Sequence, residues 1–198
     1  MLYLSGCVRD DLPPHLGIML TPMMGNRLPA DRLWAADTGC FNQPERHDDE
    51  KYLAWLAERD HTRCILATAP DVVGDAHATL ARSQPLLPRI RERGYPAALV
   101  GQDGLTPDMV PWTEIDALFI GGTTRWKLGE AAAELVQAAN AQGKWTHMGR
   151  VNSERRVMYA KSIGCKSVDG TYIAFGPDVN GPRVGRWAER ARMQQVLF

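Results

Sequence analysis

Eight short, nearly continuous apolar runs recur along the chain, and this repetition constrains the fold more than any other feature. We expect strands at residues 2–5, 17–21, 33–36, 63–67, 97–100, 117–120, 145–148 and 167–168. Helical patterns follow several of these runs, at 49–59, 76–93, 127–142 and 153–163. Such runs are typical of parallel strands buried on both faces. Because strand and helix alternate at least four times, the sequence predicts a βαβ series of the α/β class.

Two architectures can be built from such a series. A reduced or irregular (β/α)8 TIM-type barrel uses all eight strands, although about 250 residues is its usual length. The chain has 198 residues, so some helices must be missing or reduced, and we expect this near the N-terminus. A doubly wound open sheet usually carries a glycine-rich first turn, and neither GxGxxG nor a Walker A motif occurs. The sequence therefore favours the barrel, as one domain over residues 1–198 with a basic tail at about 176–198.

Glycine and proline mark the expected ends of helices. Three glycines each close a helical pattern and precede a strand: Gly94, Gly143 and Gly164. This is the position at which a left-handed helix cap favours glycine. Pro85 and Pro88 fall inside the pattern at 76–93, so we expect that helix to break into two pieces.

Composition excludes several classes of protein. Apolar residues make up 44% of the chain, and 23 Lys and Arg balance 23 Asp and Glu, which argues against a nucleic-acid binder that works by net charge alone. No apolar run approaches the roughly 20 residues that span a bilayer, and no secretory signal is apparent. We therefore expect a cytoplasmic protein without a membrane partner. The four cysteines form no CxxC pair, which argues against a zinc knuckle and a thioredoxin-type redox motif. We expect no metal, and we also expect no cofactor.

Candidate catalytic residues follow the strands, because barrel active sites lie at the carboxyl ends of the strands. Asp37 follows the run at 33–36 and Asp169 follows the run at 167–168, and each enters a turn that contains Thr and Gly. A pair of carboxylates can divide glycosidic chemistry, since one attacks the sugar carbon and the other carries protons. The alternative, that both aspartates only cap turns, is equally compatible with this pattern.

Five segments occur in the order found in one enzyme superfamily. Residues 36–43 read ADTGCFNQ, 100–104 read VGQDG, 119–122 read FIGG, 147–151 read HMGRV, and 162–169 read SIGCKSVD. They resemble the TDSGGFQ, VQGG, IGG, LMGVG and G-x-D-x-F-D segments of the queuine tRNA-ribosyltransferase (tRNA-guanine transglycosylase) superfamily. The resemblance extends over roughly residues 33–171.

One branch of this superfamily is most similar to the chain. The tRNA-acting members carry a zinc site of cysteines and a histidine, which has no counterpart in this sequence. The overall sequence is more similar to the small phage and bacterial relatives that insert 7-deazaguanines into DNA than to the tRNA-acting members. The resemblance thus implies guanine sites in DNA and a free 7-deazaguanine base, such as 7-cyano-7-deazaguanine, as partners. If the protein is encoded by a phage, the compartment is the host cytoplasm, and a homo-oligomer is left open.

The resemblance also assigns roles to the two aspartates. Asp169 would be the nucleophile that attacks C1′ of a guanosine and forms a covalent glycosyl-enzyme. Asp37 would be the general acid and base that assists departure of guanine and deprotonates the incoming deazaguanine.

A pocket for the base follows from the same motifs. It would be lined by Phe41, Asp71, Gln102, Gly121, Gly122 and Met148. Phe41 and Met148 would sandwich the base. Asp71, or failing that Asp75, would accept hydrogen bonds from its N1–H and amino group. Gln102 and the amides of the two glycines would contact its carbonyl.

A nucleic-acid substrate also requires a local basic surface, because the target base must leave the duplex or come from a single strand. Arg150, Arg183 and Arg186 are the candidate phosphate contacts, and Arg155 and Arg156 lie close to the first of them. A solvated helix face is the alternative for the tail arginines. Other functions stay open: an enzyme that acts on tRNA, a glycosidic hydrolase, or a non-catalytic nucleic-acid-binding subunit.

Overall fold

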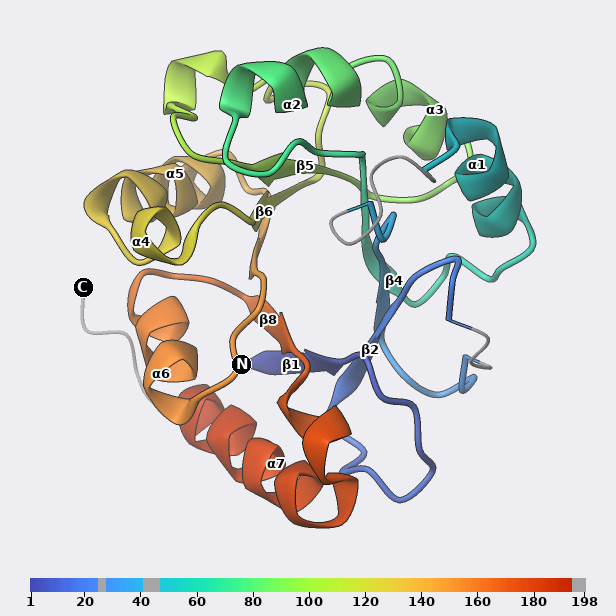
Figure 1. Cartoon of the computed structure of the whole chain (residues 1–198), viewed down its shortest axis with the longest axis vertical. Helices are drawn as coiled ribbons and strands as arrows, with labels where there is room; N and C mark the ends of the chain where they lie inside the picture. Colours follow the sequence, from blue (N-terminus) through green and yellow to red (C-terminus); the bar gives the residue numbers. More distant parts are fainter. Residues whose placement is uncertain (25–27, 41–46, 194–198) are drawn as a thin grey trace.

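In a computed structural model, which describes residues 1–24, 28–40 and 47–193, the chain forms a closed barrel of eight parallel strands (Figure 1). The strands are β1 (Leu2–Ser5), β2 (Gly17–Leu20), β3 (Trp34–Ala36), β4 (Cys64–Thr68), β5 (Ala97–Gly101), β6 (Ala117–Ile120), β7 (Trp145–Met148) and β8 (Ser167–Gly170). Each strand pairs with its neighbours in the sequence, and β8 pairs with β1 to close the ring. The predicted TIM-type barrel is confirmed.

Helices surround the barrel on its outside (Figure 1). They are α1 (Asp49–Ala57), α2 (Ala76–Ser83), α3 (Leu87–Arg91), α4 (Thr124–Lys127), α5 (Glu130–Ala141), α6 (Glu154–Ser162) and α7 (Pro177–Met193), with short 3-10 turns η2 (Pro107–Met109) and η3 (Tyr172–Phe175). In the described part of the chain, no helix lies between β1 and β2 or between β2 and β3, and β5 is joined to β6 through η2 alone. The barrel is therefore reduced near the N-terminus, as expected, and also in its fifth connection.

The core has two layers, because successive side chains of a strand point to opposite faces. On β6, Ala117 and Phe119 belong to the cluster that fills the barrel, while Leu118 and Ile120 belong to the layer between barrel and helices. The same alternation holds around the ring, and it decides which side chain beyond each strand reaches the mouth of the barrel.

The predicted helix break and helix caps are found in the structure. The pattern at 76–93 is divided into α2 and α3, with proline in the first turn of α3. The pattern at 127–142 differs from the expectation of one helix, since α4 ends at Lys127 and α5 begins only at Glu130. The three capping glycines adopt positive φ values of 81°, 70° and 100° at Gly94, Gly143 and Gly164.

A buried arginine organises the helix-free connection between β1 and β2. The guanidinium of Arg32 donates hydrogen bonds to the carbonyls of Leu12, Pro13 and Leu16, at 2.8–3.2 Å. Charged side chains are buried only where their donors are satisfied. The hydrogen bonds of Arg32 therefore give a defined shape to the loop that connects β1 to β2 without a helix.

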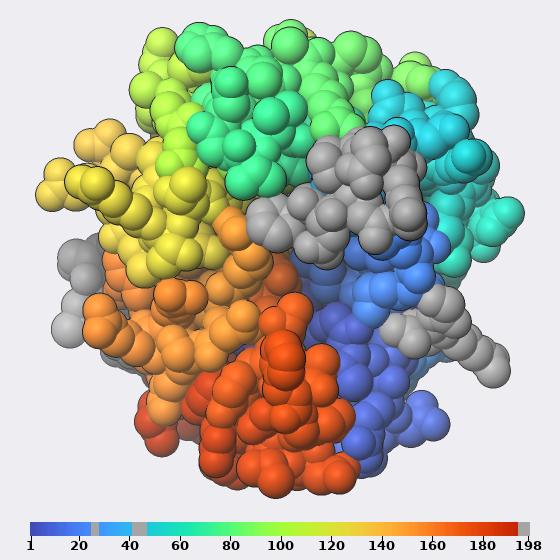
Figure 2. Space-filling view, viewed as in Figure 1, coloured from blue at the N-terminus to red at the C-terminus, as the bar shows by residue number. Residues whose placement is uncertain are grey.

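The basic tail is a 17-residue helix, α7, which packs against this loop and against β1. Two glycines permit the close approach, because a Cβ at Gly181 or at Gly185 would lie 3.0 Å from Leu12 or Pro13 respectively. In Figure 2 the blue N-terminal part and the red-orange C-terminal part lie side by side, as the pairing of β1 with β8 requires. Among the described residues, no helix has both the length and the apolar character needed to cross a membrane.

Candidate active site at the carboxyl end of the barrel

The mouth of the barrel brings carboxylates together from strands far apart in the sequence. Asp37 directly follows β3, Asp71 lies in the loop after β4, and Asp169 belongs to β8. All strands run in parallel, so their carboxyl ends share one mouth. The charges of Asp169 and Asp71 both act on Asp37. The structure thus places the two predicted catalytic aspartates at the same end of the barrel.

Asp37 is held in conditions that favour its protonated form. Burial is the main cause that raises its pKa, and the charges of Asp169 and Asp71 raise it further, to about 6. The backbone N–H of Gly39 donates to Oδ1 at 2.7 Å, which opposes the shift. A carboxyl group with such a pKa can give and take a proton near neutral pH.

Asp169 is oriented by the loop and strand beside it. Its Oδ1 lies 2.9 Å from Nε2 of His147, and its Oδ2 has one long contact, 3.5 Å, with the backbone N–H of Arg150. The side chain is 17% exposed. His147 is completely buried, and Oγ of Ser167 lies 2.8 Å from its Nδ1. One carboxylate oxygen of Asp169 is therefore in contact with His147, and the other has only this one long contact among the described residues.

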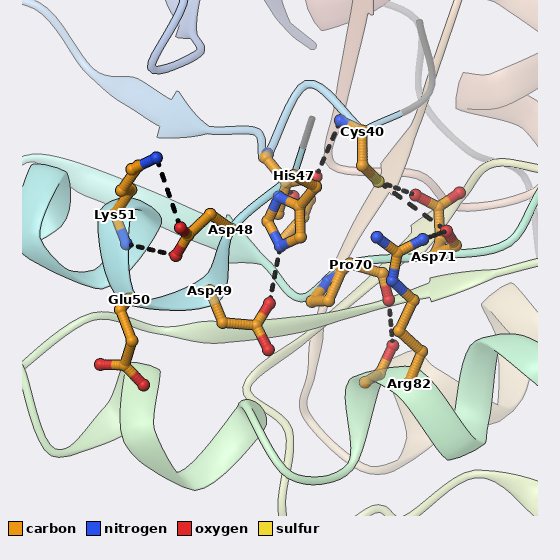
Figure 3. Close-up of polar contacts among 12 residues, drawn as sticks. Cys40, His47, Asp48, Asp49, Glu50, Lys51, Pro70, Asp71 and Arg82 are labelled. Carbon is orange, nitrogen blue, oxygen red and sulfur yellow. Dashed lines mark hydrogen bonds and ion pairs between the residues drawn. The ribbon is translucent and has the colours of Figure 1, made fainter. Parts of the chain in front are cut away.

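Asp71 is fixed by its neighbours in the mouth (Figure 3). Its carboxylate accepts from Nε2 of Gln102 at 2.5 Å and from Sγ of Cys40 at 3.0 Å. The other end of the Gln102 amide accepts from the N–H of Gly74 at 3.0 Å. Both polar atoms of Gln102 thus form hydrogen bonds within the protein, and this side chain holds Asp71 in place. Its contact with the carbonyl of a base stays a prediction. Asp75, the alternative to Asp71, instead caps α2.

Cys40 is not a nucleophile in this arrangement. Burial and the charge of Asp71 raise the pKa of its thiol to about 12, so the thiolate is scarce at neutral pH. All four cysteines are free thiols. Within the residues that the structure describes, no three His, Cys, Asp or Glu side chains form a group that could hold a metal ion.

The loop after β6 is shaped by glycine. The N–H of Gly121 donates to the carbonyl of Gly101 at 3.0 Å. The N–H of Gly122 has no hydrogen-bond acceptor among the described residues. A Cβ at Gly122 would lie 2.2 Å from the ring of Trp126, and its φ is 43°. Trp126 therefore packs directly on this backbone, and only glycine fits.

Two cations tie the loops after β6 and β7 to each other. Lys127, from the β6 side, is buried and donates to the carbonyl of Gly149 at 2.7 Å. Arg150, from the β7 side, donates to the carbonyls of Gly121 and Gly122. Arg150 also adopts a φ of 57°, the one positive value at a non-glycine residue in the described chain. The guanidinium of Arg150, which was predicted to contact phosphate, is thus hydrogen-bonded to the backbone and connects the two loops at the mouth.

Sequence reasoning missed Lys127 and Tyr52. Burial and the charge of Arg150 lower the pKa of Lys127 to about 8. The hydroxyl of Tyr52 is buried without a hydrogen-bond partner among the described residues, and the charge of Asp37 acts on it. Neither residue belongs to a strand end or a motif, so no pattern in the sequence pointed to them.

One member of the predicted base pocket, Met148, does not face the mouth, and the prediction for another, Phe41, cannot be compared with the structure. Met148 is fully buried in the layer between the barrel and the helices, because it follows the interior residue His147 on β7. Phe41 lies outside the described residues. A cavity of about 200 Å³ adjoins the turn after β3 and is lined by Thr38, Gly39 and Cys40, among others.

The arginines predicted to bind phosphate separate into two groups. Arg183 and Arg186 are exposed on α7, and Arg183 donates to the hydroxyl of Tyr172 at 2.7 Å. Arg155 and Arg156 line a cavity of about 490 Å³ at the start of α6, together with Ser153, Leu128 and Tyr159. Neither of these two guanidinium groups forms an ion pair with a residue that the structure describes.

Comparison with known proteins places the fold among TIM barrels. No family model matches the sequence, and no curated protein is significantly similar to it. The Amycolatopsis orientalis BexX/CysO complex aligns with a TM-score of 0.60 and 16% identity, over 99% of this chain and 94% of that chain. A mandelate oxidase variant aligns at 0.59 and 11%, over 90% and 65%. Tryptophan synthase from M. tuberculosis aligns at 0.53 and 13%, over 82% and 62%.

These likenesses concern the fold. The chain spans less than two thirds of the mandelate oxidase and tryptophan synthase chains. Both are enzymes on the same barrel, and none of the three is a guanine transglycosylase. Since many unrelated activities share this barrel, the function has to be argued from the site.

Proposed function

We propose that the protein is an enzyme, a guanine transglycosylase that replaces guanine in DNA with a 7-deazaguanine. The observation that carries the proposal is the pair Asp37 and Asp169 at one mouth, in different surroundings. Asp37 has a raised pKa of about 6, and one carboxylate oxygen of Asp169 has a single long contact with the part of the chain that the structure describes. Two carboxyl groups with different environments are the usual means by which one site supplies an acid and a nucleophile.

The exchange proceeds in two half-reactions. In the first, Oδ2 of Asp169 attacks C1′, the C1′–N9 bond breaks, and its electron pair leaves with guanine, which takes a proton from the carboxyl group of Asp37. In the second, Asp37 accepts the proton from N9 of the incoming deazaguanine, N9 attacks C1′, and the bond to Asp169 breaks. Each step conserves protons and electrons, and no redox partner is required.

Asp71 would bind the guanine-type edge of either base. Its carboxylate accepts hydrogen bonds only, as the N1–H and the exocyclic amino group of such a base require. Gln102 and Cys40 already hold Asp71 in place, so little of its freedom is lost on binding. The N–H of Gly122 would donate to the carbonyl of the base.

The phosphodiester backbone would be bound beside α6. Arg155 and Arg156 line the cavity at the start of this helix, which follows the loop after β7 that contains Arg150. Phosphate groups favour such a place, because guanidinium groups and a helix N-terminus both attract anions. A neutral protein can thus bind nucleic acid through a local patch.

The experiment is an exchange assay with separate polymers. The protein is incubated with labelled guanine and either guanine-containing DNA or tRNA, and a parallel sample is run on a denaturing gel to detect a covalent adduct. We expect label in DNA and an adduct that Asp169→Asn abolishes. Label in tRNA alone would show that the substrate is RNA. Label and adduct in neither polymer would refute the transglycosylase.

A further inference from the structure

A chain of polar side chains runs through the barrel interior to Asp169. Nε1 of Trp145 lies 2.8 Å from Oγ of Ser167, and the same oxygen lies 2.8 Å from Nδ1 of His147. Nε2 of His147 then lies 2.9 Å from Oδ1 of Asp169. Ser167 and His147 have no exposed surface, so water does not replace these contacts.

The pairing of β7 with β8 creates this chain. Trp145 and His147 are two residues apart on β7, and Ser167 and Asp169 are two residues apart on β8. Side chains at this spacing point to the same face of a strand. The register aligns His147 with Ser167. All four side chains are thus directed into the barrel, and the chain ends at the mouth.

The donor and acceptor roles along the chain follow from the inventory of protons. An indole N–H can only donate, so Oγ of Ser167 accepts from Trp145. The single hydroxyl proton of Ser167 then has Nδ1 of His147 as its acceptor. The opposite arrangement, with a proton on Nδ1, would leave the hydroxyl without an acceptor in the described structure. In a neutral ring, a proton on Nδ1 would also leave Nε2 unprotonated, so its lone pair would face the carboxylate of Asp169 and the two acceptors would repel each other.

We infer that Trp145, Ser167 and His147 form a directional donor chain that fixes the Nε2–H tautomer of His147 and holds Asp169 by its Oδ1. Oδ2 is then the oxygen that is presented to the sugar. His147 is a positioning residue, because it acts on the reaction through Asp169. The attack on the sugar rests on the proposed function, whereas the tautomer and the chain do not.

The first test is the tautomer itself, measured by ¹⁵N–¹H correlation NMR of the imidazole in the full-length protein. We expect a pyridine-like Nδ1 and a pyrrole-like, protonated Nε2 for His147 at neutral pH. Ser167→Ala removes the hydroxyl that donates to Nδ1, so we expect the tautomers to mix in that variant. A protonated Nδ1 in the wild type, in either a neutral or a charged ring, would overturn the inference.

The second test is the rate of adduct formation with a guanine-containing DNA oligonucleotide. His147→Phe keeps the packing but has no donor, and we expect the rate to fall about 10²-fold, the usual effect of a small misplacement of a reacting group. His147→Gln carries an amide N–H that can reach Asp169, and we expect it to recover most of the rate. Equal loss in both folded variants, or no loss in His147→Phe, would refute the positioning role.

A matched control lies on the same strand. Thr146 faces away from the barrel interior, and its single hydroxyl proton has Oδ1 of Asn140 and the carbonyl oxygen of Gly164 as acceptors, both at 3.2 Å. Thr146→Val thus damages a buried hydrogen bond of β7 without touching the chain, and we expect a wild-type adduct rate. If the wild type forms no adduct with any guanine-containing nucleic acid, the proposed function fails, and the NMR experiment still decides whether the chain exists.

Discussion

A carboxyl group takes its chemistry from its surroundings, and Asp37 and Asp169 differ in theirs. Asp37 has a partly buried place near two other carboxylates, which favours its protonated form. Asp169 instead accepts from His147, a donor that is itself held by Ser167. In the proposed reaction, the same residue type would therefore act as a proton carrier at one strand end and as an oriented nucleophile at another.

The raised pKa of Asp37 predicts how stability depends on pH. The folded protein keeps the proton up to about pH 6, whereas the unfolded chain releases it near its ordinary value of 3.8. The stabilisation is therefore complete below about pH 3.8 and is lost as the pH rises through 6, by about 3 kcal/mol at most. Urea unfolding of the wild type and Asp37→Asn from pH 4 to 8 measures this. A difference that does not change with pH would contradict it.

The same pKa predicts the rate of the first half-reaction. Because Asp37 must be protonated to assist departure of guanine, adduct formation should slow above about pH 6, by about tenfold per pH unit. Single-turnover gels from pH 5 to 8 provide the measurement. Asp37→Asn should form adduct about 10²–10⁴-fold more slowly and without this dependence. A rate that rises with pH would exclude Asp37 as the acid.

At the scale of elements, the loops of the mouth stabilise one another. Asp103 after β5 accepts from the N–H and hydroxyl of Thr123 after β6, at 2.7 and 2.6 Å. Lys127 and Arg150 join the next pair of loops. The N–H groups of Thr171 and Tyr172 donate to Asn152, which joins the loop after β7 to that after β8. A short barrel with few helices thus keeps its site rigid through contacts between neighbouring loops.

The buried cation in this network predicts a second dependence on pH. Since the pKa of Lys127 is lowered from 10.5 to about 8, the unfolded chain binds more protons between these values, and stability rises with pH across this window. Relative to Lys127→Met, the wild type should gain up to about 3 kcal/mol from pH 8 to 10.5. The control is Lys166→Met, which removes an exposed lysine on the carbonyl of Lys144. A gain of the same size relative to this variant would mean that the dependence on pH does not come from the buried Lys127.

Gly149 gives a test of how closely the β7 loop fits the site. A methyl group there would lie 2.6 Å from the ring of Phe119 and 3.3 Å from Oδ1 of Asp169. Gly149→Ala should therefore destabilise the fold by about 1–3 kcal/mol and slow adduct formation about 10²-fold. Gly6→Ala, after β1, meets nothing closer than 4.0 Å and is the control. Equal effects in both variants would mean that the space around Gly149 is not limiting.

For the whole molecule, the relevant property is where charge is placed, since the net charge is zero. Arg155 and Arg156 lie in one cavity beside the mouth, whereas other arginines are paired, as Arg190 is with Glu154. If the proposed function is correct, the phosphates of the nucleic acid would contact the protein at this pair of guanidinium groups.

This arrangement predicts the salt dependence of DNA binding. Each phosphate contact to a single strand contributes about 0.7 to the slope of log K against log salt, so the double change of Arg155 and Arg156 to Ala should lower the slope by about 1.4. Anisotropy titrations of a labelled guanine-containing oligonucleotide give the slope. Arg63→Ala, at the opposite end of the barrel, is the control. An unchanged slope in the double variant would place the phosphates elsewhere.

The sequence by itself determined the strands, the barrel and the presence of an aspartate after β3 and in β8. These properties are local, because apolar runs, capping glycines and helix-breaking prolines act within a few residues. The resemblance to the transglycosylases also came from linear motifs. The helix at the tail was predicted only as a basic segment, since Gly181, Pro182 and Gly185 are poor helix formers whose place is set by packing.

Only the tertiary structure decided what the side chains of the site do. Gln102 and Arg150 were assigned to base and phosphate, but both are engaged by loops distant in sequence. Met148 faces the helices because of the alternation on β7. The two-residue spacing of Trp145 and His147 was visible in the sequence, but the contact of His147 with Ser167 depends on the register of β7 and β8. Contacts between residues far apart in the chain are set by closure of the barrel, which no local pattern encodes.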